Sequence, residues 1–150
     1  NRNVGVHGRV NKLGVPSFVF SREEFIAGVP ILEKLAEYDV CLIVLAGFMN
    51  KISDVILQAF PGKIVNIHPA LLPKYGGKGM YGMHVHEAVV KAGERESGIT
   101  IHYINEHYDE GAIIFQASCP VLPSDTPEEV ASKVHALEYA HYPHVIESLL

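Results

Sequence analysis

The segment KIVNIHPALLPKY, residues 63–75, brings an amide and an imidazole to the end of a strand-like run. Asn66 and His68 lie two residues apart, so on an extended strand both side chains point to the same face. Open α/β sheets bind ligands beyond the carboxyl ends of their strands. Pro69 and Pro73 restrict the backbone that follows and would hold both side chains near one geometry. The pattern favours a functional pair; the alternative is a structural Asn–His pair at a strand end.

A third candidate is Asp109, in the segment NEHYDEG between two strand-like runs. Asp-x-Gly is common in turns, so an ordinary turn aspartate is the competing interpretation. If Asp109 reaches His68, its carboxylate would stabilise the protonated imidazole. The sequence alone does not show whether the two side chains meet.

His84 and His86 form an HxH pair after a glycine-rich loop, and such pairs occur in metal sites. A metal would need His68 or His102 as a third ligand. On a helix that begins at His84, however, residues two apart diverge around the axis. We therefore expect no metal here, with loop histidines and a locally hydrogen-bonded His102 as the simpler interpretation.

The elements that would position these residues predict an α/β fold. Capping boxes begin helices at Ser21 and Thr126, and alternation of helical and strand-like runs predicts βαβ units. We expect an open, mainly parallel, twisted sheet flanked by helices, Rossmann-like, with antiparallel strands in the C-terminal part. Helices are expected at residues 4–13, 22–38, 53–60, 84–93 and from 126 onward. The second of these is interrupted at 28–30, and the last is kinked or broken at Pro143. Strands are expected at residues 17–20, 40–47, 63–68, 98–104 and 112–121.

Composition limits the class of protein. The chain has 150 residues, of which 48% are hydrophobic, and a net charge of −5, so we expect one globular domain, residues 1–150, with no basic footprint for nucleic acid. The sequence has no apolar run long enough for a membrane span. Cys41 and Cys119 lie in or beside strand-like runs and have no CxxC spacing, which favours buried, reduced thiols in a cytoplasmic protein.

Four segments together resemble the formyltransferase family that uses 10-formyltetrahydrofolate, in particular its members that act on glycinamide ribonucleotide. They are LAGFM (45–49), NIHPALLPKY (66–75), GITIHYI (98–104) and YDEG (108–111). The resemblance implies a catalytic trio of Asn66, His68 and Asp109. It further implies folate contacts from Arg22, Met49, Asn50, Lys51, Ile52 and Asn66, nucleotide contacts from Gly47, Pro69 and Glu138, and secondary roles for His84 and His102.

The implied activity is transfer of a formyl group from 10-formyltetrahydrofolate, a cosubstrate, to the glycinamide amine in purine biosynthesis. A cytoplasmic monomer or homodimer without metal is expected. Asn50 stands where the family usually has arginine, and the loop around residues 78–82 is longer than in relatives. The family's upstream strand, phosphate-binding glycine loop and helix are absent from the sequence, which suggests a chain that begins partway through the fold.

Several alternatives share parts of this pattern. A formyltetrahydrofolate hydrolase would transfer the formyl group to water. A methionyl-tRNA formyltransferase would favour a basic surface and an Arg-Gly-Ala stretch, where this chain has KYGGKGMYG. A non-catalytic folate- or nucleotide-binding module and a metal-dependent hydrolase using His68, His84 and His86 are the remaining possibilities.

Overall fold

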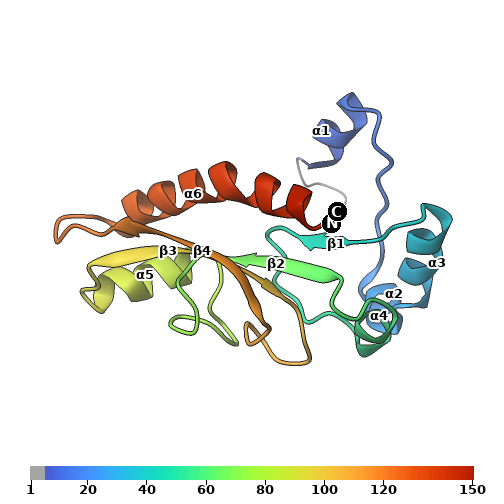
Figure 1. Cartoon of the computed structure of the whole chain (residues 1–150), viewed down its shortest axis with the longest axis horizontal. Helices are drawn as coiled ribbons and strands as arrows, with labels where there is room; N and C mark the ends of the chain where they lie inside the picture. Colours follow the sequence, from blue (N-terminus) through green and yellow to red (C-terminus); the bar gives the residue numbers. More distant parts are fainter. Residues whose placement is uncertain (1–5) are drawn as a thin grey trace.

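The computed structural model describes residues 6–150 as an open four-stranded sheet with helices packed against it (Figure 1). The strands are β1 (Ile43–Leu45), β2 (Ile64–His68), β3 (Glu96–Tyr103) and β4 (Ile113–Pro120), in the spatial order β1-β2-β3-β4. β1 and β2 are parallel, whereas β2–β3 and β3–β4 are antiparallel. The predicted open α/β sheet is confirmed, but its described strands are mixed rather than mainly parallel, because β3 and β4 both join the sheet in antiparallel pairs.

The described helices agree with most of the predicted positions. The predicted capping boxes are both present, since Ser21 and Thr126 each accept a bond from the backbone N–H three residues on. The break at Gly28 is confirmed, because this glycine ends one helix with a left-handed backbone and begins the next. The helices are α1 (Val6–Lys12), α2 (Arg22–Ala27), α3 (Val29–Glu37), α4 (Asp54–Ala59), α5 (Met83–Lys91) and α6 (Pro127–Ser148).

Two hydrophobic clusters form the core. In one, α5 and α6 bring Val89, Val130 and Val134 against Ile99 of β3. In the other, α2, α3 and α4 surround the β1–β2 pair, with Ile56 and Ile64 among its buried members. All the residues named here are at most 2% exposed. The helices therefore pack closely against the strands that carry the candidate site and hold them in place.

Three predictions were wrong. Residues 17–20 form no strand. β1 has three residues instead of eight, and Val44 is 38% exposed, because β1 pairs only with β2 among the described strands. Cys41 is exposed, and only Cys119 is partly buried. At Pro143, where a kink or a break was expected, α6 continues without a break, and a kink there stays a prediction. For the helix expected at 4–13, residues 4 and 5 lie outside the described part.

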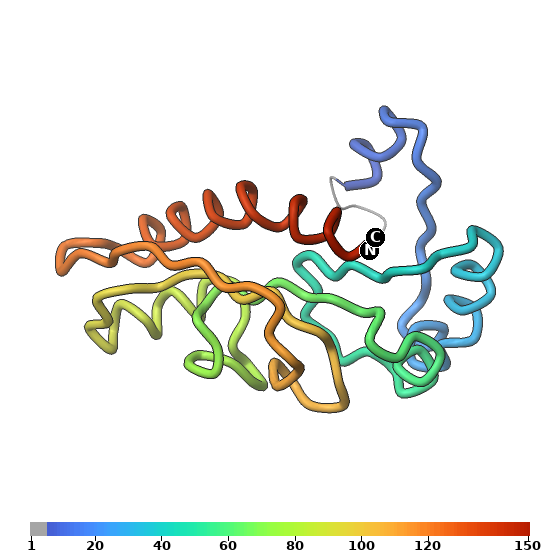
Figure 2. The backbone as a smooth tube through the Cα atoms, viewed as in Figure 1, coloured from blue at the N-terminus to red at the C-terminus, as the bar shows by residue number. Residues whose placement is uncertain are grey.

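Two loops project from the same side of the sheet (Figure 2). One follows β2 and leads to α5, and the other joins β3 to β4. The side chain of Asp109 in the second loop accepts a 2.9 Å hydrogen bond from the Gly77 N–H in the first. The two loops are therefore tied together beside the end of β2, where the candidate residues lie. Within residues 6–150, none of the helices is both long and apolar enough to cross a membrane.

Candidate active site

Asn66 and His68 lie on one face of β2, as the sequence predicts. The antiparallel register places Asn66 opposite His102 and His68 opposite Thr100, so all four side chains share that face. His68 is 3% exposed and His102 is fully buried. Polar side chains buried on a sheet need hydrogen-bond partners, and those partners define how each one is oriented.

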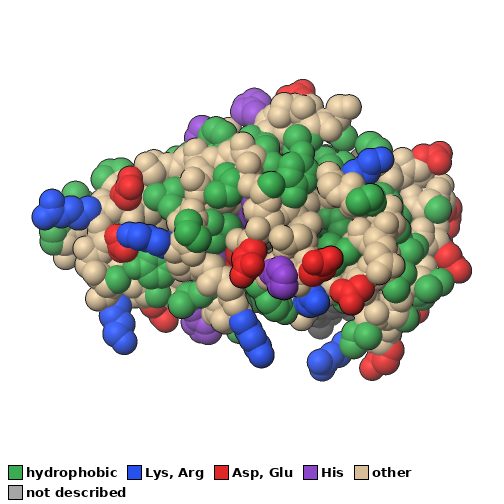
Figure 3. Space-filling model, turned by 60° about the horizontal axis from the view of Figure 1, so that its bottom comes forward, with side chains coloured by type: hydrophobic (Ala, Val, Ile, Leu, Met, Phe, Trp, Pro, Cys, Tyr) green, Lys and Arg blue, Asp and Glu red, His purple; other side chains and the backbone are tan. Residues whose placement is uncertain are grey.

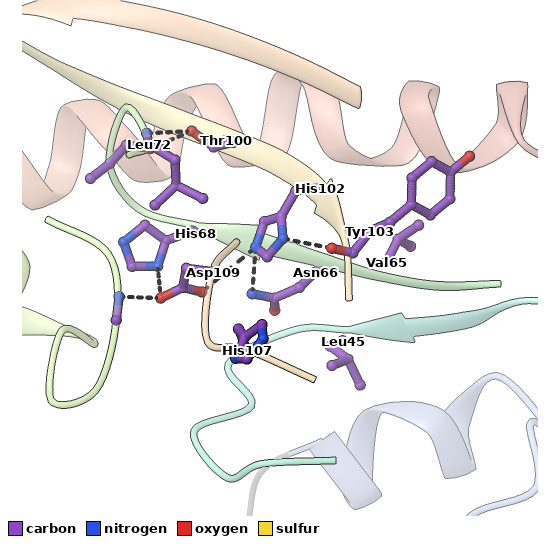
Figure 4. Close-up of polar contacts among 12 residues, drawn as sticks. Leu45, Val65, Asn66, His68, Leu72, Thr100, His102, Tyr103, His107 and Asp109 are labelled. Carbon is purple, nitrogen blue, oxygen red and sulfur yellow. Dashed lines mark hydrogen bonds and ion pairs between the residues drawn. The ribbon is translucent and has the colours of Figure 1, made fainter. Parts of the chain in front are cut away.

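Asp109 lies between the two histidines (Figure 4). Its Oδ2 is 3.6 Å from Nδ1 of His68, and its Oδ1 is 3.6 Å from Nε2 of His102. The backbone of Asp109 has φ of 57°, a left-handed conformation that aspartate tolerates in turns. The meeting of Asp109 with His68, which the sequence left open, is therefore present in the structure.

Both ring nitrogens of His68 face hydrogen-bond acceptors. Nε2 lies 2.7 Å from the carbonyl oxygen of Tyr75, which can only accept, so Nε2 carries a proton. Nδ1 faces the Asp109 carboxylate. A ring that faces two acceptors is best satisfied as imidazolium, with N–H groups on both sides. The geometry thus suits a positively charged His68 with Nδ1–H directed toward Asp109.

A buried hydroxyl fixes the turn that follows β2. Thr100 Oγ1 accepts from the Leu72 N–H at 2.9 Å and donates to the Ala70 carbonyl at 2.7 Å. Gln116 donates to the same hydroxyl at 2.8 Å and to the Leu72 carbonyl at 3.0 Å. These bonds connect β3 and β4 to residues 70–72, so the backbone leaving His68 is held by the neighbouring strands.

The trio opens onto a cavity of about 850 Å³. A cavity of this size is typical of sites for small molecules and cofactors. Its walls come from the loop after β1, the end of β2, the two projecting loops and one face of α6. Among its lining residues are Gly47, Met49, Asn50, Lys51, Ile52, Asn66, His68, Pro69, Asp109 and Glu138.

The formyl transferase family model matches residues 2–146 of the chain. The chain belongs to the formyl transferase family. The predicted resemblance is therefore confirmed at the level of the family, and the match extends over almost all of the sequence.

Formyltransferases of known name are similar to this chain along most of its length. Phosphoribosylglycinamide formyltransferase of Bacillus subtilis is 39% identical over 146 residues, which are 95% of this chain and 72% of that protein. The chloroplastic enzyme of the same name from Arabidopsis thaliana is 42% identical over 141 residues, or 91% of this chain. The chain spans about half the length of that plant relative, with 48% of it covered.

Solved formyltransferase structures share the fold. The crystal structure of phosphoribosylglycinamide formyltransferase from Streptococcus pneumoniae TIGR4 aligns with a TM-score of 0.88 and 36% sequence identity. The alignment covers 99% of this chain and 82% of that one. The mixed sheet and its helices are thus those of a formyltransferase.

Three of the candidate residues lie away from the cavity lining. Arg22 is exposed at the start of α2. His84 is exposed at the start of α5, where its ring lies 5.2 Å from that of Tyr81. His102 is buried behind Asn66 and reaches the trio only through it and Asp109. The assignment of Arg22 to folate and a secondary role for His84 stay predictions.

His86, which the sequence analysis considered only as a possible metal ligand, lines the cavity, and so do His135 and Tyr142, which the sequence analysis did not identify. His135 Nδ1 is 2.9 Å from Glu138 Oε2, one helical turn away on α6. Tyr142 lies four residues beyond Glu138, so helical spacing around Glu138 was the signal that could have identified both. His86 is 2% exposed; burial lowers its pKa, and the neighbouring His135 lowers it further.

Two further features concern the possible metal ligands and the surface charge of the described residues. No group of three or more His, Cys, Asp or Glu side chains within residues 6–150 is arranged to hold a metal ion. On the face shown in Figure 3, lysine and arginine side chains lie apart from one another, with acidic side chains between them. That face has no continuous basic stripe of the kind that tracks a phosphate backbone.

Proposed function

We propose that the protein transfers a formyl group from 10-formyltetrahydrofolate to the amine of N1-(5-phospho-D-ribosyl)glycinamide, a step of purine biosynthesis. The observation that carries the proposal is the convergence of Asn66, His68 and Asp109 at one wall of the cavity. Similarity to phosphoribosylglycinamide formyltransferases over at least nine-tenths of the chain supports the choice of acceptor.

The two substrates would approach the trio from different walls. Met49, Asn50, Lys51 and Ile52 form a loop beyond β1 whose backbone amides and carbonyls can recognise the polar edge of a pterin ring. Glu138 on α6 offers a carboxylate that can accept bonds from ribose hydroxyls, with its side chain 23% exposed. Gly47 and Pro69 also line the cavity and would contact the nucleotide.

The formyl carbon would then be attacked by the glycinamide amine. A new C–N bond forms as the bond from the formyl carbon to N10 breaks, and negative charge develops on the formyl oxygen in between. Asn66 carries amide N–H groups that can donate to that oxygen, and the positive charge of a protonated His68 would stabilise it electrostatically while the Nδ1–H stays directed at Asp109. Removing one such donor costs roughly a hundredfold in rate in other enzymes.

A proton must also move, because the amine loses one and N10 gains one. Asp109 lies 3.6 Å from His68 Nδ1 and would keep the ring positively charged while the oxygen is negative. The same carboxylate, directly or through a water molecule, would relay the proton from the amine to N10. Its orientation is fixed by the Gly77 N–H.

The test measures release of the deformylated folate by the protein in its natural length, with glycinamide ribonucleotide or with water alone as acceptor. Turnover that requires the nucleotide is expected. Equal turnover without the nucleotide would instead establish a hydrolase, and no turnover in either case would overturn the proposal.

Two variants test the roles of the trio. His68→Gln keeps a nitrogen near the Tyr75 carbonyl but removes the one facing Asp109, and Asp109→Asn keeps an acceptor for Gly77 without the charge. Each is expected to lower kcat by roughly a hundredfold or more with little change in folate affinity. His144→Gln is the control, because that side chain is 81% exposed on α6. Equal losses of kcat and folate affinity would contradict a catalytic role.

A further inference from the structure

His102 does not line the cavity, yet it contacts two members of the trio. It is fully buried on β3, directly opposite Asn66 on β2. Its Nδ1 is 2.9 Å from the carbonyl oxygen of its neighbour Tyr103, and its Nε2 is 3.3 Å from Nδ2 of Asn66. Each ring nitrogen therefore has one hydrogen-bond partner, although Nε2 also lies 3.6 Å from Asp109 Oδ1, beyond hydrogen-bond distance. The chemistry of the two nearer partners decides where the proton lies.

The partners of His102 select one neutral tautomer. The Tyr103 carbonyl can only accept, so Nδ1 must carry the proton. The amide nitrogen of Asn66 can only donate, so Nε2 must be the acceptor. Charged imidazolium would place an N–H against the NH₂ group of Asn66. The pKa of His102 is lowered, chiefly by burial; His68 lowers it further, and Asp109 opposes the effect. The lowered pKa agrees with a neutral ring.

The tautomer in turn fixes the amide of Asn66. With the amide as it stands, one N–H of Nδ2 binds His102, and the second N–H remains for the cavity that Asn66 lines. A flipped amide would put the Oδ1 acceptor against the Nε2 lone pair, so the buried Nε2 of His102 would lose its donor. An unsatisfied buried polar group is costly, so the flipped orientation is disfavoured.

With this tautomer of His102, only His68 of the two histidines can donate an N–H to the Asp109 carboxylate. Asp109 is equally far, 3.6 Å, from a nitrogen of each histidine. Neutral His102 presents no proton to that carboxylate, whereas protonated His68 does. If His102 were charged, it would compete for Asp109 and reduce the stabilisation of the His68 cation.

We infer that His102 is a positioning residue: as the neutral Nδ1–H tautomer it orients the Asn66 amide toward the formyl oxygen and leaves the Asp109 carboxylate to His68. The inference rests on the proposed function for the identity of the reacting oxygen. The orientation of Asn66 itself does not depend on which acceptor is used.

The first experiment reads the tautomer directly. Nitrogen-15 NMR of the ring of His102 in the protein at pH 7 is expected to show a protonated Nδ1 and an unprotonated Nε2. His102→Phe identifies the signals by their loss. A ring that is protonated at Nε2 would overturn the inference whatever the catalytic activity, so this outcome is separate from failure of the proposed function.

The second experiment compares two substitutions that each keep one half of the ring's hydrogen bonding. His102→Gln can place an oxygen acceptor where Nε2 meets Asn66, and His102→Asn can keep the donor to Tyr103 but not that acceptor. His102→Asn is expected to lower kcat by roughly a hundredfold with little change in KM, as loss of an oxyanion donor does. His102→Gln is expected to keep most of the kcat of the parent protein. Equal losses in two variants that both remain folded by circular dichroism would indicate a structural role only and contradict the inference.

Discussion

The hydroxyl of Tyr142 on α6 donates a 2.8 Å hydrogen bond to the carbonyl oxygen of Leu45, the last residue of β1 and 97 positions earlier in the chain. Tyr142 is 8% exposed, and burial raises its pKa above the ordinary tyrosine value. The bond therefore persists through neutral and moderately alkaline pH. It joins the closing helix to the strand whose following loop forms one wall of the cavity.

Tyr142→Phe removes this hydroxyl and keeps the ring. The Leu45 carbonyl then loses its side-chain donor in a buried place, so the free energy of unfolding should fall by about 1–2 kcal/mol. Urea denaturation of the variant and the parent checks this value. Tyr139→Phe, at a position 80% exposed on the same helix, should cost almost nothing. Equal effects at the two positions would show that the buried hydrogen bond contributes no stability.

Gly111→Ala should disrupt the loop that carries Asp109. A Cβ at this position would lie 1.7 Å from the Tyr103 carbonyl oxygen, and a backbone atom cannot move aside cheaply. We expect a loss of about 3 kcal/mol of stability and a fall in turnover, as Asp109 shifts from the histidines. Gly8→Ala on α1 is the matched control, because no atom lies within 4 Å of its added Cβ. Thermal unfolding and turnover of both variants decide the point; a fully active and stable Gly111→Ala would refute it.

Thr100→Val tests the hydroxyl that fixes the turn after His68. The substitution keeps the shape of the side chain but leaves the Leu72 N–H and the Ala70 carbonyl without their partner. A cost of about 2–3 kcal/mol is expected for these buried groups. Thr100→Ser keeps the hydroxyl and loses one methyl group, so it should cost only about 1 kcal/mol. The reverse order in chemical denaturation would mean that packing, rather than hydrogen bonding, governs this position.

His86 should make stability depend on pH. Its pKa is lowered in the folded protein below the ordinary value of 6.5, so the unfolded chain binds more protons just below that pH. Stability is therefore highest above about pH 6.5 and falls as the solution is acidified through the window between the unfolded and folded values. His86→Leu should reduce this slope in unfolding measurements from pH 7.5 to 5.5.

The control for this pH dependence is His144→Gln, which alters an exposed histidine of α6 and should leave the slope unchanged. His102 contributes in the same direction, since burial also lowers its pKa, so a part of the slope should remain in His86→Leu. A slope unaffected by His86→Leu would mean that His86 does not drive the acid sensitivity.

The sequence predicted those features that depend on neighbours within a few residues. The caps at Ser21 and Thr126 bond to groups three positions away, and the strand period places Asn66 and His68 on one face. The same local rules failed at β1, because how far a strand extends depends on its pairing partners. At Pro143 they left a kink and a break open, and the helix continues without a break because its other hydrogen bonds and its packing on the sheet remain.

Residue types and local patterns by themselves indicated the strand that bears the amide and the imidazole. The resemblance of four sequence segments to the formyltransferases implied the family and the candidate trio. Only the tertiary structure decided that Asp109 lies between two histidines, since His68 and Asp109 are 41 positions apart and meet through the pairing of β2 with β3 and the Gly77 contact. It also decided that His68 faces two acceptors, whereas His102 has one acceptor at Nδ1 and, at Nε2, a donor from Asn66 that is nearer than the Asp109 carboxylate. The protonation of the two histidine rings depends on these neighbours. Contacts between distant segments set which groups become neighbours, so the sequence alone does not reveal them.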